Sequence, residues 1–243
     1  MPPSTRDHLL AMAKGRTYFG HQSVGENLLQ GLAELAQHEQ VALPVTSATG
    51  GTAFSTPGVV HERLGENEKP FTKIEAFERA VEGGIGGRAD LAFFKLCYID
   101  FAATTDVDPI FERYRETIAR LKAKHPTTKF GHVTSPLTVT QQGIKAAIKA
   151  LLGRPRWGEA ENAVRHRYNE RLRQTYAGKE PLFDLARLEA MRPDGSLESF
   201  SYEGRSIPRL VGAYSDDGQH LNAMGRSYVA AKLASFVAET LGG

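Results

Sequence analysis

The run DLAFFKLCYI, residues 90–99, constrains the fold more than any other stretch of the sequence. It is nearly continuously apolar over a length that suits a single strand. A strand of this kind is buried on both faces, which happens mainly in parallel sheets covered by helices. The run therefore predicts a central strand of an α/β sheet.

The rest of the chain alternates short apolar runs with amphipathic stretches, which is the pattern of a parallel sheet between helices. Further strands are expected at residues 16–20, 41–47, 128–134 and 181–186. Residues 52–70, rich in proline and glycine, are expected to form a long loop. Because no internal repeat or Gly/Ser linker divides the chain, we predict one domain over residues 1–243. Its expected fold is a three-layer α/β/α sandwich of about five parallel strands in the flavodoxin-like order 2-1-3-4-5.

A shorter stretch carries an apolar stripe of Ile144, Ile148 and Leu151 at helical spacing. Such a stripe can form a lid over a site or a face that touches lipid. Packing against the rest of the domain is the commoner use of an amphipathic helix. We therefore expect this helix to pack onto the domain.

Charge and cysteine content argue against several classes of function. Thirty basic and twenty-eight acidic residues give a net charge of +2, which argues against nucleic acid or another extended polyanion as partner. Arginines at 165, 167, 171 and 173 alternate with glutamates and predict a solvated, ion-paired helix face. The single cysteine, Cys97, allows neither an internal disulfide nor a cysteine zinc site, and the histidines lack metal-ligand spacing. We expect no metal and no cofactor.

The sequence also bears on the compartment. No run reaches the roughly 18 apolar residues of a membrane span, and the first residues lack the apolar core of a signal peptide. These features predict a soluble protein without a membrane span, cytoplasmic by default and exported if a leader has been removed. They leave its oligomeric state open.

Ser23 stands in GHQSVG, where the first predicted strand gives way to a helix. Ligands of open parallel sheets bind beyond the carboxyl ends of the strands, where the strand order reverses. In the order 2-1-3-4-5, the end of the first strand lies beside the end of the third, where CYID (97–100) follows. Ser23 can be a nucleophile in this crevice, or it can simply cap the helix.

The other end of the chain supplies YSDDGQHLNAMG, in which Asp217 and His220 stand three residues apart before the last predicted helix. This spacing lets the carboxylate hold the imidazole in one tautomer. A serine needs such a base, because its hydroxyl is a poor nucleophile at neutral pH. The same residues could equally form an acidic turn that caps the final helix, and the sequence leaves both interpretations open.

Together, the GHQSVG and DDGQHLN blocks resemble the SGNH/GDSL hydrolase superfamily over nearly the whole chain, and look closest to a little-described bacterial branch of it. The resemblance implies a serine hydrolase that cleaves an ester, with Ser23 as nucleophile, His220 as base and Asp217 as orienting carboxylate. Asp216 fits less well, because it is four residues from the histidine. The implied substrate is a small-molecule or glycan ester, with acetyl on a carbohydrate as the first candidate. The alternatives are an acyltransferase or acetyltransferase with the same triad, and a non-catalytic binding domain that keeps the fold.

One departure from the superfamily pattern affects the chemistry. Its third block usually carries an asparagine that donates to the oxyanion hole, and CYID has Ile99 at that place. A tetrahedral oxyanion needs about two or three convergent donors. The candidate donors are the Ser23 backbone N–H, an N–H of Gly51 or Gly65, and the side-chain amide of Asn67. Further residues expected to line the site are His21, Tyr98 and Asp100.

Overall fold

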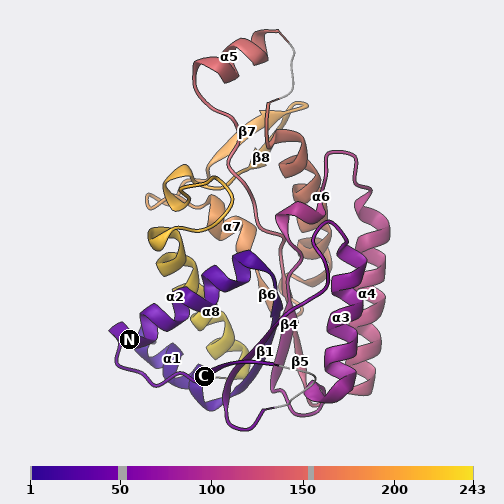
Figure 1. Cartoon of the computed structure of the whole chain (residues 1–243), viewed down its shortest axis with the longest axis vertical. Helices are drawn as coiled ribbons and strands as arrows, with labels where there is room; N and C mark the ends of the chain where they lie inside the picture. The colour runs from indigo at the N-terminus through magenta and orange to yellow at the C-terminus, as the bar shows by residue number, and fades with distance from the viewer. Residues whose placement is uncertain (1, 49–53, 153–155, 243) are drawn as a thin grey trace.

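The computed structural model describes residues 2–48, 54–152 and 156–242 of the chain. Its centre is a six-stranded sheet in the order β2-β3-β1-β4-β5-β6, and every neighbouring pair is parallel. The strands are β1 Arg16–His21, β2 Val45–Ser47, β3 Gly58–Arg63, β4 Leu91–Phe94, β5 Lys129–Val133 and β6 Leu182–Phe183. Helices cover both faces of this sheet (Figure 1), so the three-layer α/β/α prediction is confirmed.

Two sets of helices form the outer layers. One face of the sheet packs against α1 Thr5–Lys14, α2 Ser23–His38, α7 Leu185–Ala190 and α8 Ala223–Leu241, and the other against α3 Pro70–Ala80, α4 Val107–Lys124 and α6 Glu159–Tyr176. β4 separates the two cores. Leu91 and Phe93 point into the first, while Ala92 and Phe94 point into the second. This alternation explains why the DLAFFKLCYI run is apolar at every position of the strand.

The strand order differs from the prediction by one strand. Residues 58–63, inside the expected loop, form β3, which pairs with both β1 and β2. β3 therefore lies beside β1, where the strand at 41–47 was expected. That strand is only the three-residue edge strand β2. The loop prediction is wrong because Pro57 and Gly58 hide the start of β3, and only Val59 and Val60 in it are buried apolar residues. These residues form a strand because they pair with β1, although their own pattern does not favour a strand.

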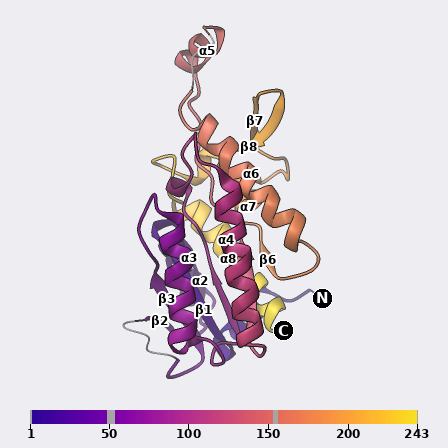
Figure 2. The same ribbon diagram turned by 90° about the vertical axis from the view of Figure 1, so that its right-hand side faces the viewer.

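Two features lie outside the sandwich. β7 Ser199–Tyr202 and β8 Arg205–Pro208 form an antiparallel hairpin. α5 Ile144–Leu151 projects from the body at the top of Figure 1 and stays clear of it in the perpendicular view of Figure 2. Ile144, Ile148 and Leu151 are 81%, 52% and 88% exposed. The prediction that this stripe packs onto the domain is therefore wrong.

In the described part of the chain, no helix combines the length and the apolar character that crossing a bilayer requires.

Candidate active site

Ser23 is the first residue of α2 and follows the end of β1. The residue that precedes the helix is Gln22, and its side chain does not cap the helix. It donates instead to the carbonyl oxygens of Leu64 at 2.8 Å and Gly65 at 2.9 Å. The capping interpretation of Ser23 is wrong, because its Oγ lies inside the first turn and makes its hydrogen bond with His220.

His220 connects Ser23 to Asp217. Its Nε2 lies 3.0 Å from the Ser23 Oγ, across a sequence separation of 197 residues. Its Nδ1 lies 2.6 Å from Oδ2 of Asp217. Because a carboxylate only accepts, Nδ1 carries the proton of the neutral imidazole, and Nε2 faces the serine hydroxyl as an acceptor. The three side chains have the order and orientation in which a histidine can take a proton from a serine.

The turn around Asp217 holds this residue as an anion. Its Oδ1 accepts hydrogen bonds from the backbone N–H groups of Gln219 at 2.8 Å and His220 at 2.7 Å. Burial raises the pKa of the carboxyl, but the hydrogen bonds from the backbone and ring of His220 outweigh it and hold the pKa well below its usual range. Asp216 has a different partner, since it accepts from the side chain of Asn222, the N-cap of α8.

His21 lies beneath the Ser23 turn and is 1% exposed. Its Nδ1 donates to the backbone carbonyl of Gln22 at 2.9 Å, so its Nε2 accepts from Nδ1 of His61, also at 2.9 Å. A Cβ on Gly25 would lie 2.2 Å from the Cβ of His21, which explains the second glycine of GHQSVG. His21 thus packs under the turn, and its role as a site-lining residue stays a prediction.

The buried histidines make the folded state sensitive to acid. Unfolded histidine titrates near pH 6.5, whereas burial lowers the pKa of His21 and of His132 to about 4 in the folded state. Their stabilising contribution is complete above about pH 6.5 and is lost as pH falls to about 4, because the unfolded state takes up more protons. Each histidine adds at most about 1.4 kcal/mol per pH unit to the fall in unfolding free energy. For His21→Asn, urea unfolding at several pH values in this range should give an unfolding free energy whose pH dependence corresponds to about one proton fewer than in the native protein. An unchanged pH dependence would contradict the assignment.

The loop after β3 is fixed against the Ser23 turn by the side chain of Gln22. Gly65 has a φ of +59°, and a Cβ there would lie 2.6 Å from the backbone nitrogen of Lys73. Glu68 also has a positive φ, of 66°, which is costly for a residue with a side chain. The loop is thus held in one conformation next to the serine. Gly51, the other glycine predicted as a donor, lies outside the described residues.

Asp100 of CYID anchors this loop from below. It forms an ion pair with Lys73 at 2.6 Å, with side-chain exposures of 0% and 1%. It also accepts the backbone N–H groups of Cys97 at 2.7 Å and Glu68 at 3.1 Å. Nζ of Lys73 lies 3.3 Å from Oδ1 of Asn67, so the amide nitrogen of Asn67 is the end that stays free to donate.

A cavity of about 600 Å³ opens beside His220. Tyr98 forms part of its wall and meets the His220 ring edge-on, with ring centroids 5.8 Å apart. Ile99 and Asp100 also line this cavity. The remaining wall includes Trp157, Glu161, Arg165 and Gln219.

Arg165, which the sequence pattern places on a solvated face, is only 4% exposed and lines the cavity. Its Nε donates to the Tyr98 carbonyl at 2.9 Å, and Nη1 donates to Thr138 at 3.0 Å and Asn162 at 2.6 Å. Burial lowers its pKa to about 10, which leaves it charged at neutral pH. A sequence signal did exist: residues 165, 168 and 172 share one helix face, and the latter two are apolar in character.

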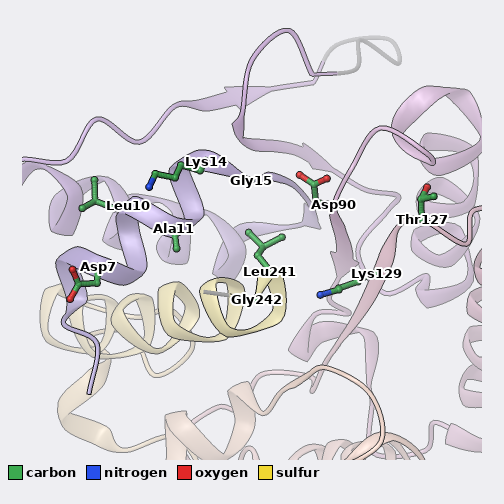
Figure 3. Close-up of a pocket in the computed structure, with 10 residues that line it drawn as sticks. All are labelled: Asp7, Leu10, Ala11, Lys14, Gly15, Asp90, Thr127, Lys129, Leu241 and Gly242. Carbon is green, nitrogen blue, oxygen red and sulfur yellow. The ribbon is translucent and has the colours of Figure 1, made fainter. Parts of the chain in front are cut away.

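A second hollow, of about 680 Å³, lies at the amino ends of the strands, between α1, α8 and the start of β5 (Figure 3). Its lining includes Lys14, Asp90, Lys129 and Leu241, but none of the candidate catalytic residues. Asp90 is already paired with Arg16. Within residues 2–48, 54–152 and 156–242, no group of His, Cys, Asp and Glu is arranged to hold a metal ion.

Comparisons with known proteins agree on the fold. No model of a known protein family matches the sequence, and no curated protein matches it. A structure of a peptidoglycan O-acetylesterase matches with a TM-score of 0.55 at 10% identity, over 98% of this chain and 95% of that chain. A Streptococcus pneumonia protein named after platelet activating factor matches with a TM-score of 0.55 at 12% identity, over 96% and 89% of the two chains. The chain therefore shares the three-layer α/β/α fold of these two proteins.

Proposed function

We propose that this protein is a serine esterase that cleaves an O-acyl ester. The observation that carries the proposal is the unbroken line of hydrogen bonds from Ser23 through His220 to Asp217. Ser23 Oγ attacks the acyl carbon while its proton moves to Nε2 of His220. The same proton then goes to the leaving alcohol, which breaks the ester C–O bond and leaves the acyl group on Ser23. His220 next takes a proton from water, whose oxygen attacks the acyl carbon. The bond from that carbon to Ser23 Oγ then breaks, His220 returns the proton to Oγ, and the acid leaves.

Asp217 has a positioning and electrostatic part in this scheme. As an anion held by its turn, it fixes the tautomer of His220 and stabilises the imidazolium that forms in each step. It accepts a hydrogen bond throughout and takes no proton.

The oxyanion would form between the start of α2 and the loop after β3. The Ser23 N–H belongs to the first helical turn, where backbone donors have no acceptor within the helix. The proposed partners are the N–H of Gly65, which makes no hydrogen bond within the described chain, and the amide nitrogen of Asn67. These groups replace the asparagine that is absent at Ile99, and each is expected to act most strongly on the transition state.

The cavity beside His220 is where the leaving alcohol would lie, because His220 delivers the proton to that group. Its wall combines the indole of Trp157 with the polar side chains of Glu161, Arg165 and Gln219. Apolar rings and convergent polar groups together suit a polyhydroxylated alcohol. The fold shared with a peptidoglycan O-acetylesterase supports an acetyl group on a carbohydrate as the first substrate to test. Transfer to a second hydroxyl would use the same three residues, and analysis of the products distinguishes it from hydrolysis.

A fluorophosphonate probe tests the proposal directly, because it reacts with an activated serine. The native protein should be labelled, and Ser23→Ala should not be. Ser227→Ala, a change at an exposed serine on α8, is the matched control and should label like the native protein. If the native protein is neither labelled nor able to hydrolyse p-nitrophenyl acetate, the binding-domain alternative is favoured instead.

A further inference from the structure

α5 carries an apolar face that no part of the described chain covers. Ile144, Ile148, Leu151 and the next residue, Leu152, are 81%, 52%, 88% and 59% exposed. Figures 1 and 2 show α5 clear of the body from two perpendicular directions. Large aliphatic side chains grouped on one exposed face mark a place of contact with another surface. We call residues 144–152 the arm.

The base of the arm is built into the wall of the candidate active site. The backbone N–H of Gln141 donates to the carbonyl of Trp157 at 3.0 Å, which joins the two ends of the segment. The N–H of Val139 donates to the carbonyl of Gly218 at 2.9 Å, next to Asp217. The arm therefore has a firm attachment, and a surface bound by it would lie on the side of the molecule that carries the cavity.

The charge of the segment indicates what kind of surface this is. Between residues 141 and 158 the sequence has no acidic residue and four basic ones, Lys145, Lys149, Arg154 and Arg156. An apolar helix face combined with lysines and without carboxylates is typical of helices that lie in the headgroup layer of an anionic bilayer. Trp157, at the base, is 48% exposed, and tryptophan is enriched at membrane–water interfaces.

We propose that the arm binds the protein peripherally to anionic phospholipid bilayers. The apolar face enters the boundary between headgroups and acyl chains, and the lysines meet the lipid phosphates. A second copy of the chain fits this face less well, because two arms with the same positive charge repel each other. The proposal does not depend on the esterase chemistry, so either one can fail without the other.

Trp157 is the single tryptophan of the chain and serves as a built-in reporter. Vesicles of phosphatidylcholine with phosphatidylglycerol should shift its emission to shorter wavelength and should carry the protein down on sedimentation. Vesicles of phosphatidylcholine alone should do so much less, and added salt should weaken binding to the anionic vesicles. Equal failure with both vesicle types would overturn the proposal.

Substitutions in the arm locate the effect. Ile148→Asp/Leu151→Asp should reduce partitioning into anionic vesicles at least about tenfold, because it removes two apolar side chains and adds two negative charges. Lys145→Gln/Lys149→Gln should reduce it about fivefold per charge removed.

The matched control is Leu10→Asp/Leu197→Asp, which places the same charges at two exposed leucines elsewhere and should cost far less. Thermal unfolding shows whether each variant is folded, and the four positions changed to aspartate are exposed in the native protein. If the control variant lost as much partitioning into anionic vesicles as the arm variants, the proposal would be overturned. A native dimer in sedimentation velocity that Ile148→Asp/Leu151→Asp converts to monomer would also overturn it, since a second copy would then cover the face.

Discussion

Ser23→Ala should lower kcat for an ester substrate by at least about ten-thousand-fold, because the attacking oxygen is lost while the rest of the site remains. His220→Ala should cost about as much, since the hydroxyl of Ser23 would then have no group to take its proton. KM should change far less than kcat in both variants, because neither residue lines the cavity proposed to receive the alcohol. Initial rates with p-nitrophenyl acetate, and then with acetylated glycans, give both parameters.

The double variant tests whether the two residues act as a unit. If Ser23 and His220 perform one proton transfer, Ser23→Ala/His220→Ala should be no slower than either single variant. Multiplicative losses would instead mean that each residue supports turnover separately, which the proposed mechanism does not allow. Asp217→Asn gives a graded comparison, because it keeps the shape of the turn while it removes the anion that fixes the His220 tautomer.

The fold could be predicted from the sequence wherever local pattern and tertiary context agree. The apolar run 90–99 identifies β4 because both faces of that strand are buried. β3 could not be predicted in this way, because it forms through hydrogen bonds to β1 and β2, which no local residue pattern reports. The exposure of α5 could not be predicted either. An amphipathic pattern shows that a helix has an apolar face, but not whether this chain supplies the surface that covers it.

The candidate site divides in the same way. The sequence alone indicates the spacing of Asp217 and His220 within one turn and the place of Ser23 after the first strand. Arg165 was assigned to a solvated face because its neighbours in sequence are charged, although its own position on α6 is buried. The ion pair of Lys73 with Asp100 joins residues 27 apart, and no motif connects them.

Lys73 of that ion pair also contacts the amide oxygen of Asn67, and substitutions at Asn67 test its assignment as an oxyanion donor. Asn67→Ala should lower kcat by about a hundredfold to a thousandfold with KM nearly unchanged, because an oxyanion donor acts mainly in the transition state. Asn67→Asp should be at least as slow: its carboxylate can pair with Lys73 as the amide oxygen does, but it offers no donor and adds a negative charge beside the oxyanion. Stability should change little in either variant, since Asn67 is exposed.

Lys73→Met separates donation from anchoring. It should cost about 3 to 5 kcal/mol of unfolding free energy, because Asp100 would be left buried without its partner. Its kcat should also fall, since the amide of Asn67 loses the contact that orients it. Urea unfolding and initial rates on the same preparations distinguish the two roles: Asn67→Ala changes rate without stability, whereas Lys73→Met changes both. If Asn67→Ala kept its kcat within about twofold, the donor would have to come from elsewhere, and the hydroxyl of Tyr98, on the ring that contacts His220, would be the next group to remove.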